Sequence, residues 1–170
     1  IMFIYADNAA TTKLRPCARE AMRPYLEECW FNPSSLYSGG QRAKEAVEAA
    51  RASVARCIGA QPREIVFTSG GTEADNWAIR AAAEACGERG KHIITTKIEH
   101  HAVLHTCSYL EQRGYEVTYL DVDADGVVHV EDVERAIRPD TVLISVMFAN
   151  NEIGSIQPIA EIGALAGSRG

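Results

Sequence analysis

Three short segments of the sequence carry the side chains whose types and spacing could do chemistry. They read Thr68-Ser69-Gly70-Gly71-Thr72-Glu73, Glu99-His100-His101 followed by His105, and Asn150-Asn151-Glu152-Ile153-Gly154. The first segment offers backbone and hydroxyl donors to an anion, the second offers imidazoles, and the third offers side-chain amides. The chemistry that they permit is therefore anion binding, ring stacking or proton transfer, and hydrogen bonding to a ligand.

The glycine-rich segment 68–73 has a composition that favours phosphate binding. Glycines let backbone N–H groups approach an anion, and the N-terminus of a following helix attracts negative charge. Thr72 adds a hydroxyl that donates to the anion or only caps the helix. The segment is neither a Walker loop, because no lysine follows, nor a G-x-G-x-x-G motif. On spacing alone, phosphate binding and a capped strand-to-helix turn are equal alternatives.

The histidines of the second segment allow a metal site, stacking or proton transfer. His101 and His105 share one helix face, but no cysteine or carboxylate stands at ligand spacing and the H-E-x-x-H order is absent. A metal centre on His100, His101 and His105 is therefore the disfavoured alternative, which metal analysis would test. His100, at the end of an expected strand, suits stacking or proton transfer, or is a half-exposed loop histidine.

The amides of the third segment have two interpretations. Asn150 and Asn151 follow the most apolar expected strand and either present donors to a ligand or form a turn, as asparagine near glycine often does. Two polar segments earlier in the chain, 7–12 and 32–35, are loops over a site or surface turns.

Alternating strands and helices must position these segments. Apolar periodicity and glycine or proline punctuation predict strands at 64–68, 92–96, 116–122 and 141–148, and helices at 17–29, 43–57, 73–86, 101–113, 131–138 and 159–166. Gly59 is expected to end the second helix, and 123–126 to form a turn. This order predicts an α/β fold with a mostly parallel sheet flanked by helices. Ligands of such sheets bind beyond the carboxyl ends of strands, where all three segments fall.

Composition limits the class of protein. The 170 residues are 46% apolar and 24% charged, as in an ordinary globular domain. The net charge of −6 argues against a nucleic-acid partner. No apolar run reaches the roughly 18 residues of a membrane span, so no membrane association is expected, and the first residues do not read as a signal peptide.

The cysteines indicate a reducing compartment. Their number is odd, and no C-x-x-C occurs, so neither a zinc ribbon nor a redox dithiol is expected. We therefore predict a cytoplasmic protein in which most of these thiols pack as small apolar side chains. They are Cys17, Cys29, Cys57, Cys86 and Cys107.

Five ordered motifs together resemble one enzyme family. They are DNAATT at 7–12, NPSS at 32–35, EIVFTSGGTEADN at 64–76, EHHAVL at 99–104 and NNEIGSIQPI at 150–159. In this order and at these separations they resemble the cysteine desulfurases, pyridoxal-phosphate (PLP) enzymes of fold type I in the class V aminotransferase group. The resemblance covers essentially the whole chain and implies the large cofactor domain of that fold.

The resemblance implies roles for particular residues. Gly71 and Thr72 would hold the PLP phosphate. His100 would stack on the pyridine ring and take part in proton transfer, and Asn151 would bond the 3-hydroxyl side of the cofactor near the substrate. Asn8 and Ala9 would lie beside the substrate carboxylate.

The resemblance also implies a division of the chain and what should follow it. Residues 1–40 would form an N-terminal segment and residues 41–170 part of the PLP-binding large domain. Family members continue with an aspartate, a glutamine, a Ser-x-His-Lys segment whose lysine holds PLP covalently, a cysteine loop and an arginine. The 170 residues stop before these groups, so by themselves they are expected to be inactive.

The activity implied is removal of sulfur from L-cysteine, giving L-alanine and an enzyme persulfide. The sulfur would pass to an acceptor protein, a scaffold or a thiolation enzyme, for iron–sulfur clusters or tRNA thiolation, and the enzyme would be a homodimer. The alternatives are selenocysteine lyase or another class V PLP enzyme, or a non-catalytic fragment of one.

Overall fold

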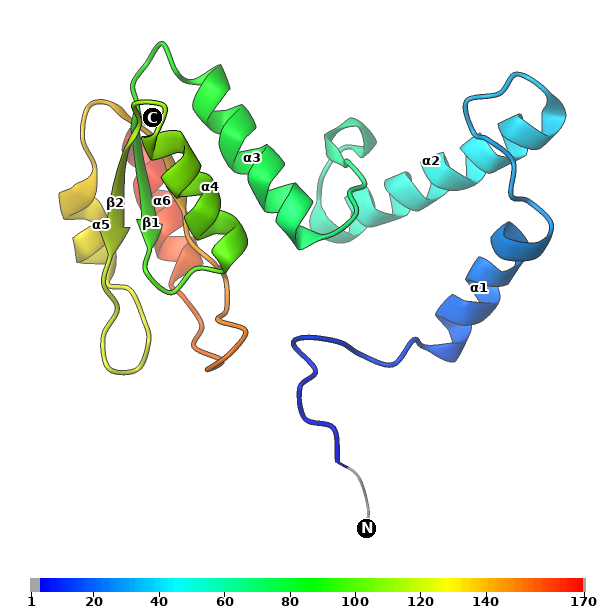
Figure 1. Ribbon diagram of the computed structural model, residues 1–170, viewed down its shortest axis with the longest axis horizontal. Helices are drawn as coiled ribbons and strands as arrows, with labels where there is room; N and C mark the ends of the chain where they lie inside the picture. Colours follow the sequence, from blue (N-terminus) through cyan, green and yellow to red (C-terminus); the bar gives the residue numbers. More distant parts are fainter. Residues whose placement is uncertain (1–3, 170) are drawn as a thin grey trace. The chain divides into compact units, whose positions relative to one another are not determined.

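The computed structural model of the chain describes residues 4–169, which are drawn in Figure 1. The chain divides into two compact units, Ile1–Phe67 and Thr68–Gly170, and each is considered by itself. The division expected after residue 40 follows the domains of the family that the motifs resemble, and it stays a prediction. Every helix within the described residues is too short or too polar to cross a bilayer.

The first unit consists mainly of two helices, α1 (Pro16–Glu27) and α2 (Ser38–Ile58). Pro16 opens α1 because its fixed φ suits the first helical position, where no N–H bond is needed. Gly59 ends α2 in the left-handed conformation, with φ of 69°, and its N–H bonds to the carbonyl of Ala55. Both predicted helices and the glycine cap are confirmed.

The strand predicted at 64–68 is wrong. Pro62–Glu64 forms a single 3₁₀ turn, η1, and Ile65 is extended, but no strand of the described chain pairs with the residues that follow. Val66 and Phe67 remain 55% and 51% exposed. The guanidinium of Arg51 donates to the carbonyl of Ile65 and lies over the ring of Phe67. An apolar, β-branched run favours extended backbone, but a strand also needs a neighbour to share its hydrogen bonds.

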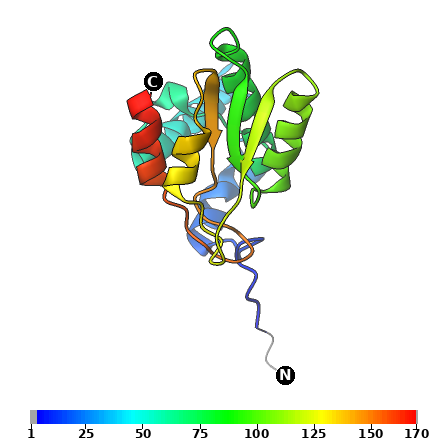
Figure 2. The ribbon, with the colours of Figure 1, turned by 90° about the vertical axis from the view of Figure 1, so that its left-hand side faces the viewer.

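The second unit is a parallel sheet of three strands flanked by helices, as predicted. The strands are β1 (His92–Thr96), β2 (Glu116–Leu120) and β3 (Thr141–Ser145), in the order β2-β1-β3. The helices are α3 (Gly71–Ala85), α4 (His101–Glu111), α5 (Val130–Ala136) and α6 (Ile159–Arg169). Figure 2 shows the three strands side by side with helices on both faces.

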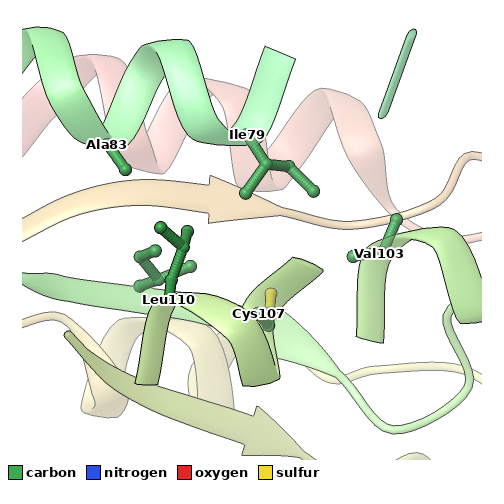
Figure 3. Close-up of a cluster of buried hydrophobic side chains, with 6 residues drawn as sticks. Ile79, Ala83, Val103, Cys107 and Leu110 are labelled. Carbon is green, nitrogen blue, oxygen red and sulfur yellow. The ribbon is translucent and has the colours of Figure 1, made fainter. Parts of the chain in front are cut away.

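The central strand β1 divides the core between the two faces of the sheet. All five of its residues are buried, and successive side chains point to opposite faces. Ile93 packs with the residues of α3 and α4 that Figure 3 shows, namely Ile79, Ala83, Val103, Cys107 and Leu110. Ile94 packs on the other face with Leu120, Val128, Val133 and Ile162. The helices are thus held in place by apolar contacts on both sides of one strand.

A buried histidine ties the three strands together. His92 is 0% exposed, and its Nδ1 and Nε2 lie 2.7 Å and 2.8 Å from the hydroxyls of Thr141 and Thr118. Because both ring nitrogens are bonded to hydroxyls, the neutral ring has its hydrogen-bonding capacity satisfied. Burial lowers the pKa of His92, and the positive charge of Arg138 lowers it further, against the opposing effect of Asp140 and Glu116.

The lowered pKa of His92 predicts a loss of stability in mild acid. Below the ordinary histidine pKa of about 6.5, the unfolded chain binds a proton at this ring, whereas the folded chain leaves the ring neutral to lower pH. The free energy of unfolding therefore decreases as the pH is lowered. We expect urea midpoints to fall between about pH 7.5 and about pH 5.5 in the parent protein and to fall less in His92→Gln.

The exposed His105 provides the matched control, because His105→Gln should keep the parent's dependence on pH. The carboxyl groups whose pKa is lowered, Glu73, Asp123 and Asp140, lose their contribution at lower pH than the histidine does. Equal pH dependence in the parent and in His92→Gln would contradict the assignment to His92.

Candidate functional site

The loops that follow β1 and β3 lie at the same edge of the sheet, because parallel strands bring their carboxyl ends together. They enclose a cavity of about 300 Å³. Its lining residues are Lys97, Ile98, Glu99, His100, His101, Leu104, Asn150, Asn151, Glu152 and Ile153. His100 and Asn151, two of the residues singled out from the sequence, therefore line one cavity although 51 positions separate them.

His100 is held at the start of α4 by its own side chain. It is the N-cap residue, and its Nδ1 accepts the backbone N–H of Ala102 at 3.1 Å. In the neutral ring the proton must then be on Nε2, since Nδ1 is the acceptor. The side chain is exposed, so Nε2 is the ring nitrogen that remains for a ligand.

The two neighbouring asparagines have different surroundings. Asn150 forms a turn, because its Oδ1 accepts the N–H groups of Glu152 at 2.8 Å and Ile153 at 3.0 Å. Its Nδ2 donates to the carbonyl of Ile98 at 3.1 Å. Asn151 is exposed beside the cavity. The turn interpretation therefore holds for Asn150, whereas Asn151 lines the cavity with an exposed amide, and its contact with a ligand stays a prediction.

Sequence reasoning assigned no role to Glu99, which the structure places in the wall of the cavity. Its side chain is only 7% exposed. One oxygen, Oε1, accepts both the hydroxyl of Thr96 at 2.9 Å and the N–H of Met147 at 2.8 Å. Burial raises the pKa of Glu99, and the two hydrogen bonds oppose that rise. A carboxylate three residues after the expected strand 92–96 was the available sequence signal, because such a group requires partners where it is buried.

The last three residues of the glycine-rich segment, Gly71, Thr72 and Glu73, lie in the first turn of α3. Gly70 is the N-cap residue and makes no side-chain cap, so the alternative in which Thr72 caps the helix is wrong. The first helical hydrogen bond runs from Ala74 N to Gly70 O, and the N–H groups of Gly71, Thr72 and Glu73 therefore lack helical acceptors. Those groups, together with the hydroxyl of Thr72, form a donor set of the kind that phosphate prefers.

A carboxylate already lies beside this helix end. Glu73 Oε2 accepts the N–H of Ser69 at 2.6 Å and its hydroxyl at 2.7 Å, and these bonds lower the pKa of Glu73. Ser69 and Thr72 line a second cavity of about 620 Å³ along the face of α3. The structure thus assigns Thr72 to a different cavity from the one that His100 and Asn151 line.

One side chain links the first turns of α3 and α4. Asn76 Nδ2 lies 2.9 Å from the carbonyl of Thr72 and 3.5 Å from the carbonyl of Ala102. The start of α3 therefore lies against the start of α4, where His100 is the cap. Asn8 and Ala9 belong to the other unit, and their place beside a substrate stays a prediction.

The histidines do not form a metal centre with other residues of the described chain. The rings of His101 and His105 lie 5.3 Å apart. Within residues 4–169, no three side chains of histidine, cysteine, aspartate or glutamate are grouped so that they could hold a metal ion. The metal alternative therefore gains no support from the geometry.

Comparison with known proteins identifies several similar sequences. A sequence model described as aminotransferase class-V matches residues 4–170. The chain is 58% identical over 163 residues to "Cysteine desulfurase IscS" of Methanosarcina thermophila, covering 96% of this chain and 40% of that protein. It is 56% identical over 162 residues to the protein of the same name from Clostridium botulinum strain Hall, covering 95% and 41%. The chain thus spans about two fifths of the length of these curated relatives.

Solved structures agree with the sequence matches. A "NifS-like protein" superimposes with a TM-score of 0.94 at 42% identity, covering 99% of this chain and 46% of that one. A structure titled "SspA in complex with cysteine" superimposes with a TM-score of 0.91 at 42% identity, covering 96% and 47%. At these identities and scores the likeness extends through the sheet and the loops that enclose the cavity.

Proposed function

Since the chain belongs to the aminotransferase class-V family, we propose that its protein is a PLP-dependent cysteine desulfurase. The reaction would remove sulfur from L-cysteine and give L-alanine and an enzyme persulfide. The observation that carries this proposal is the single cavity that His100 and Asn151 line at the carboxyl edge of the sheet. The relatives named above are cysteine desulfurases, so the selenocysteine lyase alternative is not favoured.

The described residues fit the cofactor in their donor set. Gly71 and Thr72 would hold the phosphate through the unpaired N–H groups of α3 and the Thr72 hydroxyl. The ring of His100 would lie against the planar pyridine, and the amide of Asn151 would donate to the 3-oxygen. When bound, PLP supplies the electron sink for bond cleavage at the substrate.

His100 would carry the proton transfers of this chain at one defined atom. Because its Nδ1 is occupied by the N–H of Ala102, only Nε2 can give or take a proton on the cavity side. The bond to Ala102 also fixes the tautomer of the neutral ring. Asn8 and Ala9 would contact the carboxylate of L-cysteine, as part of the N-terminal segment 1–40 that precedes the cofactor domain.

We infer further that the enzyme is a cytoplasmic homodimer that passes sulfur to an acceptor protein, for iron–sulfur clusters or tRNA thiolation. All five cysteines lie among the described residues and none forms a disulfide, which supports a reducing compartment. Cys107 is buried and its pKa is raised to about 11, so it is unsuited to carry sulfur. The expectation that residues 1–170 alone are inactive stays a prediction.

The proposed function is tested on the complete protein with PLP and L-cysteine. The protein should keep a visible absorption band of bound PLP through dialysis and release alanine and sulfide, under reducing conditions, in a manner saturable in cysteine. Protein that stays colourless after dialysis, or that turns over no faster than free PLP, would count against the proposal.

Thr72→Val should weaken PLP binding more than it weakens folding. A hydroxyl that donates to phosphate at a helix N-terminus contributes roughly 1.5–3 kcal/mol, which corresponds to about a tenfold or larger rise in the dissociation constant. Titration of the apoprotein with PLP measures this change. Ser108→Ala, which removes an exposed hydroxyl from α4, is the control. Unchanged PLP affinity together with a lower melting temperature would remove Thr72 from the cofactor site.

A further inference from the structure

His100 and Asn151, the two candidate site residues in the cavity, lie in the loops after β1 and β3. The residue directly before each of them contacts the other loop. Glu99 precedes His100, and its carboxylate accepts the N–H of Met147 in the loop after β3, at 2.8 Å. Asn150 precedes Asn151, and its amide donates to the carbonyl of Ile98 in the loop after β1, at 3.1 Å. The two contacts run in opposite directions between the same two loops, and we call them the reciprocal brace.

Both side chains of the reciprocal brace are also anchored within their own loops. Glu99 Oε1 accepts the hydroxyl of Thr96, the fully buried last residue of β1. Asn150 Oδ1 accepts two N–H groups of the turn that follows it. Neither side chain can shift without breaking bonds at both ends, so the brace couples the two loops rigidly.

Burying the polar groups of the brace has a cost that an apolar pair would not have. A carboxylate that is 7% exposed loses hydration, and an apolar contact at such a position often stabilises a fold equally well. What hydrogen bonds add is direction, because they are satisfied over a narrow range of distance and angle. A device of this kind suits a place where the spacing of two loops matters.

We propose that Glu99 and Asn150 are positioning residues, which set the spacing of His100 and Asn151 across the cavity through the reciprocal brace. The proposal rests on the proposed function for its catalytic consequence, since it concerns the same cavity. The structural part of the proposal, that the brace sets the distance between the two loops, does not depend on that function. Loss of either of the two contacts of the brace should let the two loops separate and displace the ring of His100.

Three substitutions separate a positioning role from other roles of these residues, and a fourth serves as the control. Glu99→Gln keeps an oxygen that can accept both hydrogen bonds but removes the charge, whereas Glu99→Ala removes the acceptor. Asn150→Asp keeps the oxygen that forms the turn but replaces the Nδ2 donor, so the contacts of Nδ2 with the carbonyl of Ile98 and the sulfur of Met147 are lost. Glu111→Ala removes a carboxylate from α4 that bonds the hydroxyl of Tyr119 and serves as the control.

The first measurement is the side-chain NMR spectrum of the complete protein labelled at histidine, without PLP. We expect the ring resonances of His100 to shift and broaden in Glu99→Ala and in Asn150→Asp, while those of His105 stay unchanged. Glu99→Gln and Glu111→Ala should reproduce the parent spectrum. A general loss of stability would not select one histidine over the other.

The second measurement is the turnover of the same variants with PLP and L-cysteine. Displacement of a reacting group by about 1 Å can cost about 10²-fold, so we expect kcat to fall by about that factor in Glu99→Ala and Asn150→Asp, with KM changing much less. The double variant should lose little more than the worse single one, because both arms serve one spacing.

An unshifted His100 resonance in Glu99→Ala or Asn150→Asp would overturn the proposal, and so would a Glu99→Gln variant as disturbed as Glu99→Ala. If Glu99→Ala does not fold, Asn150→Asp and Glu99→Gln still decide it. If the parent protein neither binds PLP nor turns over cysteine, the proposed function fails, and the histidine spectra still decide whether the brace positions His100.

Discussion

Replacing His100 with alanine should lower turnover by about 10²- to 10⁴-fold, the range in which general acid–base groups contribute. The ring caps α4 at the edge of the cavity, and its Nδ1 bond to Ala102 leaves Nε2 as the only nitrogen able to transfer a proton there. The measurement is kcat for sulfide release from L-cysteine by the complete protein with saturating PLP.

His105→Ala is the matched control for that experiment. His105 is exposed one turn further along α4, its ring lies against that of His101, and it does not line the cavity. Its removal should change kcat by less than about twofold, as expected for a surface residue outside the site. Small and equal losses in the two variants would remove His100 from the mechanism.

Replacing Ile93 with alanine should lower the free energy of unfolding by about 2–5 kcal/mol. The side chain is 0% exposed at the centre of the sheet and packs against the residues of α3 and α4 that Figure 3 labels, so its truncation leaves a cavity that close-packed neighbours cannot fill. Urea denaturation followed by circular dichroism measures the loss.

Two further substitutions calibrate the result for Ile93. Ile93→Val removes one methylene group and should cost about 0.5–1.5 kcal/mol. Ile156→Ala truncates the same side chain where it is 63% exposed and should cost less than about 0.5 kcal/mol. If Ile93→Ala and Ile156→Ala were equally mild, the packing of α3 and α4 on β1 would not be the source of stability described here.

Sequence pattern predicted the elements whose signals are local. The strand 92–96 and the helix cap at Gly59 were confirmed at their predicted positions, because apolar runs and glycine conformations are written within a few residues. The parallel order of strands and helices was also confirmed. The family resemblance directed attention to His100 and Asn151, and the structure places both in one cavity.

The presence and the ends of strands were less predictable, because both depend on hydrogen-bond partners that are distant in the sequence. The segment 64–68 has the composition of a strand, yet no neighbour in the described chain shares its hydrogen bonds. The strand predicted at 141–148 stops at Ser145. Two residues further on, the N–H of Met147 bonds to the carboxylate of Glu99. Strand propensity alone cannot predict that a carboxylate 48 positions away accepts a backbone N–H at the end of a strand.

The sequence by itself determined the fold class and the three chemically capable segments, because periodicity, glycine placement and side-chain type are local properties. Only the tertiary structure decided which amide forms the turn, that Gly70 rather than Thr72 is the N-cap residue of α3, and that Glu99 lies in the wall of the cavity. The two bonds of the reciprocal brace span 48 and 52 positions of the chain. Their partners meet because the sheet aligns the carboxyl ends of β1 and β3, and no local pattern specifies that alignment.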